Sequence, residues 1–120
     1  MIIFEPPFQK IMNLQDIQNQ IDTSQGVALY FTAPHCGVCF ALKPKLEELF
    51  DHHFGKIRFI SVPVEKHPEI AAFHNVFTAP ALLVFLEGKE YVRKSTNMGI
   101  GEVKEAVGRL YRLLSEDSNE

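Results

Sequence analysis

Apolar and polar residues alternate along this chain in two different patterns. Short apolar runs bounded by turn signals predict β-strands, whereas apolar residues that recur every three or four positions predict amphipathic helices. The strands are expected at residues 8–12, 27–32, 57–62, 81–86 and 91–94, the last after a hairpin turn at 87–90. The helices are expected at about 14–22, from the cysteines to just before Gly55, at 68–75, and through Val103, Val107, Leu110 and Leu114.

This order of elements, βαβαβαββα, predicts the fold class. Strands that alternate with helices and then end in a hairpin indicate an α/β protein with a mixed central β-sheet flanked by helices on both faces. No internal repeat and no linker rich in proline, glycine or serine divides the sequence. We therefore expect one domain over residues 1–114, followed by a polar, acidic tail over residues 115–120.

The composition of the chain argues against nucleic acid and membrane as partners. The chain has 120 residues, 46% of them hydrophobic, and a net charge of −3, which argues against nucleic acid as its main partner. No apolar run approaches the length of a membrane span, and Glu5 and two prolines interrupt the apolar start, which does not read as a signal peptide. We therefore expect a cytoplasmic protein that binds neither nucleic acid nor membrane.

The only two cysteines, Cys36 and Cys39, lie between a predicted buried strand and a predicted helix. The start of a helix offers unpaired N–H groups and a positive dipole end, which favour the reactive thiolate over the thiol. In a reducing compartment such a pair is more often redox-active or metal-binding than structural. The alternatives are two inert buried thiols, or zinc or an iron–sulfur cluster shared with a second subunit, because two cysteines do not complete a four-ligand site.

Three markers together resemble the thioredoxin family over nearly the whole chain. They are Cys36-Gly-Val-Cys39 at a helix start, Pro44 within that helix, and Thr78-Ala-Pro80 before the strand at 81–86; Gly99 matches a further family glycine. The resemblance implies a thioredoxin-like fold and a thiol–disulfide oxidoreductase that reduces or exchanges protein disulfides. A single Cys-x-x-Cys motif would be a weak signal, but the combination in this order is specific.

The resemblance also implies residue roles. Cys36 corresponds to the attacking thiol and Cys39 to the resolving thiol. Pro80 corresponds to a cis-proline, and Ala79 to the residue whose backbone pairs with an extended substrate. The substrate groove would be shaped by Gly37, Val38, Ala79 and Gly99. No organic cofactor and no metal are expected, because the cysteines carry the electrons; a thioredoxin-reductase-like partner would restore the dithiol, and the fold is expected to be complete as a monomer.

Several residues depart from the family pattern. His35 replaces the usual tryptophan, Val38 the proline between the cysteines, and Phe40 the basic residue after them. Tyr30 stands where the family has a buried aspartate, and Ser61 where it has the accompanying lysine. Since the aspartate helps to move the proton of the resolving thiol, general-base assistance to Cys39 is in question. The departures favour a divergent thioredoxin-like protein over a housekeeping thioredoxin.

Other side chains carry smaller expectations. An imidazolium at His35 would stabilise the neighbouring thiolate and make the disulfide more oxidising than in ordinary thioredoxins. Tyr30 is expected in the core, and Met98 either lines the groove or is a plain loop residue. The remaining histidines are expected on the surface: His52, His53, His67 and His74.

Two functions compete with the oxidoreductase. One is a non-catalytic thioredoxin-fold module that binds a partner through the same groove, which the missing aspartate, lysine and tryptophan favour. The other is a redox-regulated adaptor whose disulfide state controls partner binding without turnover. Retention of both cysteines disfavours a simple binding module, since binding alone needs neither.

Overall fold

The structure, a computed structural model, describes residues 13–96 and 98–118. Along the chain the elements are α1 (Leu14–Thr23), β1 (Gly26–Thr32), α2 (Gly37–His53), β2 (Ile57–Pro63), α3 (Pro68–Phe73), β3 (Ala81–Leu86), β4 (Lys89–Ser95) and α4 (Ile100–Ser118). From the first helix onward this is the predicted order. The edge strand predicted at 8–12 lies outside the described residues.

The described strands form one mixed sheet in the order β2-β1-β3-β4. β1 runs parallel to β2 and antiparallel to β3, which pairs in turn with the antiparallel β4. Every residue of β1 and β3 is buried, whereas β2 mixes buried with more exposed positions and β4 has a single buried residue, Val92. The continuous apolar runs of β1 and β3 are therefore those of the two inner strands, as expected for strands covered on both faces.

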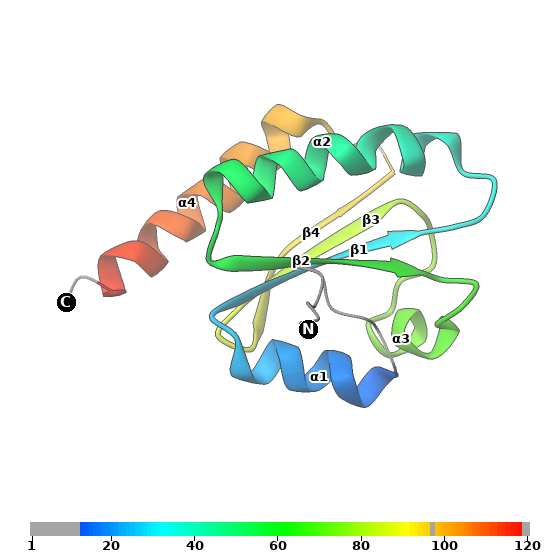
Figure 1. The fold of residues 1–120 in the computed structure, drawn as a ribbon, viewed down its shortest axis with the longest axis horizontal. Helices are drawn as coiled ribbons and strands as arrows, with labels where there is room; N and C mark the ends of the chain where they lie inside the picture. Colours follow the sequence, from blue (N-terminus) through cyan, green and yellow to red (C-terminus); the bar gives the residue numbers. More distant parts are fainter. Residues whose placement is uncertain (1–12, 97, 119–120) are drawn as a thin grey trace, which may run out of the picture.

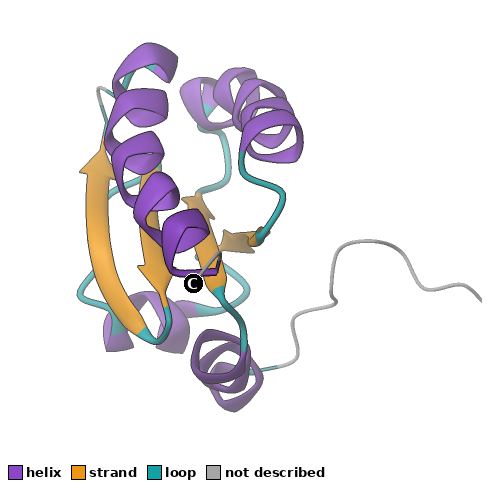
Figure 2. Ribbon diagram, turned by 90° about the vertical axis from the view of Figure 1, so that its left-hand side faces the viewer, coloured by secondary structure: helices purple, strands orange, loops and turns teal. Residues whose placement is uncertain are grey.

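Helices cover both faces of the sheet (Figures 1 and 2), so the predicted fold class is confirmed. α2 and α4 lie on one face, and α1 and α3 on the other. Because side chains alternate along a strand, β1 contributes Ala28 and Tyr30 to the α2/α4 core and Val27, Leu29 and Phe31 to the α1/α3 core.

Most boundaries shift by one or two residues from the prediction, and two of the differences have a clear physical reason. The hairpin turn contains only Glu87 and Gly88, both with positive φ (50° and 88°), so β4 begins at Lys89 opposite Leu86. Two successive left-handed residues match the right-handed twist of the paired strands and need no longer loop. At the other end, α4 continues to Ser118, so residues 115–118 extend the helix instead of forming the predicted tail; this segment holds no proline or glycine that would end it.

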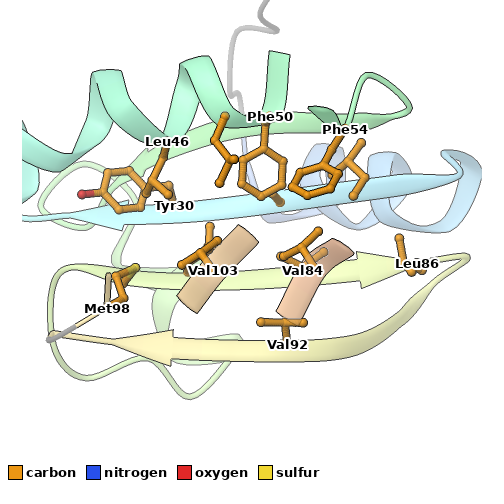
Figure 3. Packing of buried hydrophobic residues seen from close by; sticks show 14 residues of the cluster. Tyr30, Leu46, Phe50, Phe54, Val84, Leu86, Val92, Met98 and Val103 are labelled. Carbon is orange, nitrogen blue, oxygen red and sulfur yellow. The ribbon is translucent and has the colours of Figure 1, made fainter. Parts of the chain in front are cut away.

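Two side chains lie deeper than the sequence predicts. Met98 is 7% exposed and belongs to the α2/α4 core, so it is neither a groove residue nor a plain loop methionine (Figure 3). His74 is 8% exposed, whereas a surface position was expected. Its ring packs against those of Phe31, Phe73 and Phe85, which come from three separate segments and leave no local pattern at position 74.

None of the helices within residues 13–96 and 98–118 combines the length and the apolar character that a bilayer span needs.

Candidate active site

The cysteine pair lies where β1 gives way to α2. β1 ends at Thr32, Cys36 is the N-cap residue of α2, and Cys39 lies in the first turn of that helix. The two sulfurs form a disulfide, with the Cα atoms 5.3 Å apart. Cys39 is fully buried, whereas Cys36 is partly exposed. Cys36 is therefore the member of the pair that solvent reaches.

Backbone donors surround Cys36. The Cys39 N–H donates to Cys36 Sγ over 3.1 Å, and the Phe40 N–H donates to the Cys36 carbonyl oxygen over 3.3 Å. The first N–H groups of a helix have no partner within the helix and carry its positive dipole end. When the disulfide is reduced, this arrangement favours a thiolate at Cys36.

A cis peptide bond joins Ala79 and Pro80 just before β3. Ala81 pairs with Phe31, which places Ala79 and Pro80 at the end of the sheet where β1 leads into the cysteine loop. Pro80 is buried and its carbonyl oxygen accepts from the Thr96 N–H over 2.9 Å, while Ala79 is partly exposed. The fold thus brings the sequence segment around residue 80 to the cysteine end of the molecule.

Three further expected site residues lie within two positions of Cys36 in the chain. They are His35, Gly37 and Val38, and all three are exposed, Val38 by 59%. His35 has a left-handed backbone, with φ 62°, in the turn between strand and helix. Gly99 is exposed ahead of α4, and a Cβ there would meet no atom within 4 Å. That Gly99 shapes a substrate groove stays a prediction.

Tyr30 is the residue beneath the cysteines. It is fully buried, as predicted, and its hydroxyl donates to the Cys39 carbonyl oxygen over 2.9 Å. Figure 3 shows its ring within the α2/α4 core and its oxygen pointing away from the other labelled side chains. Burial raises the pKa of Tyr30 to about 12, because a phenolate would lose its hydration there. The position of the family's aspartate therefore holds a neutral donor.

The sequence did not reveal a group of hydrogen bonds that holds the chain segment before the cis-proline. Arg93 of β4 donates to the carbonyl oxygens of His74 (2.8 Å) and Asn75 (3.4 Å) at the end of α3. Glu90 holds the same guanidinium through two contacts of 2.7 and 2.9 Å. These bonds fix the start of the segment that leads to Pro80. A spacing of three residues between Glu90 and Arg93 was the only local signal.

A hollow of about 1060 Å³ lies at the other end of the sheet. It is lined by the α1–β1 turn, the C-terminal part of α2, the α2–β2 turn and the first residues of β2, including Gly26 and Ile57. The cysteines are not part of it. Among the described residues, no three histidine, cysteine, aspartate or glutamate side chains come together as a metal site would require.

A disulfide at the start of a helix, on a mixed sheet of this order with a cis-proline at the same end, defines a thioredoxin-type oxidoreductase. The thioredoxin family profile matches residues 9–107 of this sequence. The chain belongs to the thioredoxin family, and its function is that of a thiol–disulfide oxidoreductase.

Individual relatives agree with this assignment. The thioredoxin-like protein YdfQ of Bacillus subtilis is 31% identical over 101 residues, covering 84% of this chain and 89% of that protein. The thioredoxin of the same bacterium is 35% identical over 80 residues, covering 66% and 77%. A mutant thioredoxin of Entamoeba histolytica, with 25% identity, has a TM-score of 0.73 over 82% of this chain and 95% of that one. Oxidised thioredoxin from Plasmodium falciparum, with 22% identity, has a TM-score of 0.71 and shares the fold, over 81% and 91%.

Proposed function

We propose that Cys36 is the attacking thiol and Cys39 the resolving thiol in the reduction or exchange of protein disulfides. The observation that carries this assignment is the difference in burial: Cys36 is partly exposed and accepts the Cys39 N–H, whereas Cys39 is fully enclosed. An exposed thiolate is the group that a substrate disulfide can meet.

Each of the two exchange steps forms one disulfide bond and breaks another. The Cys36 thiolate attacks one sulfur of the substrate disulfide, so a Cys36–substrate bond forms and the other substrate sulfur leaves as a thiolate. Cys39 then loses its proton and attacks Cys36 Sγ, which forms the Cys36–Cys39 disulfide and releases the second substrate thiolate. The substrate has gained two electrons, and an electron donor of the thioredoxin-reductase type returns two electrons to the pair.

The surroundings of the pair suit a protein substrate. Val38 and Phe40 are about 60% exposed (59% and 60%) beside the disulfide, and they offer apolar contact to a polypeptide. Ala79 would present its backbone to an extended segment of the substrate, while His35, Gly37 and Gly99 would adjust access and thiolate stability. Members of this family generally act on protein disulfides with a reductase; for this chain, the particular substrates, a monomeric state and a cytoplasmic location are part of the proposal.

Turnover of a protein disulfide tests the assignment. We expect the reduced protein to cleave the disulfides of insulin with dithiothreitol as electron donor, at a rate well above that of dithiothreitol alone. Cys36→Ser should reduce the rate to that background. Cys39→Ser, reduced beforehand and mixed with insulin after dithiothreitol is removed, should form the first bond but accumulate as a mixed disulfide, which mass spectrometry of the intact adduct detects.

Two other results of this experiment would each indicate one of the competing functions. A wild-type protein that binds a partner tightly but never turns over a disulfide, even with fully reduced thiols, would contradict the assignment and indicate a binding module. If the wild-type protein shows no turnover and Cys36→Ser changes its affinity for a partner, the protein is a redox-regulated adaptor.

A further inference from the structure

The backbone N–H and the carbonyl oxygen of Cys39 both form hydrogen bonds with other residues. Its N–H donates to Cys36 Sγ over 3.1 Å, and its carbonyl oxygen accepts the Tyr30 hydroxyl over 2.9 Å. Tyr30 belongs to β1 and Cys39 to α2, so this second bond ties the first turn of the helix to an inner strand of the sheet. The resolving cysteine is therefore fixed from two sides.

The surroundings of Tyr30 are apolar. Its partners across the sheet are Ser61 on β2 and Leu82 on β3, neither of which ionises. Its ring stacks on Phe59, with the centroids 5.9 Å apart, and the helices above supply the side chains of the α2/α4 core, such as Leu46. Burial raises the pKa of Tyr30 to about 12, so the phenol keeps its proton near neutral pH.

Ionisable groups on the α2/α4 side lie on the segment of Cys39 itself and on β4 and α4, where Lys94 pairs with Glu102 over 3.5 Å. His35 is exposed, Cys36 is partly exposed, and Lys43 is partly buried one helical turn further along α2. His74, a buried titratable residue that directly follows α3, packs on Phe31 and so lies on the opposite face of the sheet. On the α2/α4 side of the described structure, the buried hydroxyl of Tyr30 is a neutral group that bonds directly to the backbone of Cys39.

We propose that Tyr30 is a positioning residue for the resolving step: it holds Cys39 for attack on the mixed disulfide and takes no part in moving its proton. The proposal rests on the roles assigned above to the two cysteines. The Cys39 proton then passes to water or hydroxide, the Cys39–Cys36 bond forms, and the Cys36–substrate bond breaks with its electron pair leaving on the substrate thiolate. A hydroxyl that already donates to a carbonyl oxygen constrains geometry without serving as a base.

A single-turnover reaction separates the two steps. We would mix the reduced full-length protein with an equimolar amount of dithiobis(nitrobenzoic acid), an aromatic disulfide whose thiolate product absorbs visible light. Attack by Cys36 releases the first thiolate and resolution by Cys39 releases the second, which gives two phases in stopped flow. Wild type would be compared with Tyr30→Phe, which removes only the hydroxyl.

Tyr111→Phe is the matched control. The Tyr111 hydroxyl also bonds to the backbone, accepting the Lys56 N–H over 3.1 Å, but it lies at the α2–β2 turn, away from the cysteines. Unfolding in urea would be measured for both variants. A purely structural effect of losing a tyrosine hydroxyl would then be visible in Tyr111→Phe as well.

We expect Tyr30→Phe to slow the second phase by about two- to tenfold, the range of one neutral hydrogen bond, and to leave the first phase nearly unchanged. The second phase should accelerate steadily with rising pH between about pH 6 and pH 8 in both proteins, because the Cys39 thiol must lose its proton to water or hydroxide before it attacks. Tyr111→Phe should behave as wild type in both phases.

Three results would overturn the inference. The first is a second phase of Tyr30→Phe that equals that of wild type, and the second is a pH dependence that changes when the hydroxyl is removed. The third is a wild-type second phase that already levels off near pH 6.5, which would reveal an internal base acting on the Cys39 thiol. If Tyr30→Phe does not fold, the wild-type pH profile alone decides. If neither phase occurs in wild type, the proposed function itself fails.

Discussion

At the scale of single residues, His74 shows how burial changes the protonation of a side chain. Its imidazole is 8% exposed and packs among three phenylalanine rings, and its Nε2 atom is buried without a hydrogen-bond partner. Burial lowers the pKa of His74; nearby Glu90 opposes that shift and Arg93 adds to it. The folded protein therefore prefers the neutral ring, whereas the unfolded chain takes up a proton near pH 6.5.

His74 should make stability depend on pH. Because the folded pKa lies below the unfolded one, the unfolded state binds more protons between the two values, and stability falls as the pH drops below about 6.5. His74→Phe should remove this contribution, and at neutral pH it should leave stability equal or higher by about 1 kcal/mol, since an unpaired buried nitrogen is lost. Urea unfolding at about pH 7.5 and about pH 5 measures both effects.

His53→Phe provides the control, because His53 is an exposed residue at the end of α2. It should keep the wild-type loss of stability between the two pH values. A His74→Phe variant with the same loss as wild type would show that other groups, and not His74, cause the acid sensitivity.

At the scale of elements, β1 is the strand on which the site is built, and Gly26 is where it enters the sheet. A Cβ at Gly26 would lie 2.9 Å from Ile57 Cγ1 on β2 and 3.1 Å from Leu86 Cδ2 on β3. Both neighbours pair directly with Gly26, so they hold it from either side. The glycine is needed here for close packing between strands.

Gly26→Ala should lower the free energy of unfolding by about 1–3 kcal/mol, the usual cost of overpacking. Urea unfolding compared with Gly101→Ala gives the test. Gly101 lies in the first turn of α4, where a Cβ would meet no atom within 4 Å, so alanine there should be neutral or stabilise the helix by up to about 1 kcal/mol. Equal effects of the two substitutions would contradict the packing argument.

At the scale of the whole molecule, the disulfide lies at one end of a sheet that two apolar cores already hold together. One core lies under α2 and α4 and the other under α1 and α3, and each is made of side chains from at least three elements. The pair is separated by only three positions in sequence, so it closes a very short loop. The fold should therefore survive both redox states, as a reversible catalyst requires.

Reduction should leave the far-ultraviolet circular dichroism unchanged and lower the free energy of unfolding by only about 2 kcal/mol, the entropic value for so short a loop. Urea unfolding with and without dithiothreitol measures the difference. The double variant Cys36→Ser, Cys39→Ser should show no dependence on dithiothreitol. Loss of the sheet signal on reduction would contradict this independence.

Local sequence determined the elements and the chemistry. Apolar runs of six or seven residues identify β1 and β3 because a buried strand needs little else. Cys36 and Cys39 lie one helical turn apart because their spacing matches the period of a helix start. The same local signals predicted the mixed α/β fold.

Tertiary structure decided what depends on contacts between distant residues. Local sequence does not signal that His74 and Met98 are enclosed, because the buried groups that cover them, such as Phe31 and Phe85 around His74, come from other segments. The bond from Tyr30 to the Cys39 carbonyl spans nine positions and the bond from Arg93 to the His74 carbonyl spans nineteen, beyond the reach of any periodic pattern. The sequence determined which thiols react, and the packing of strand against helix decided which groups hold them.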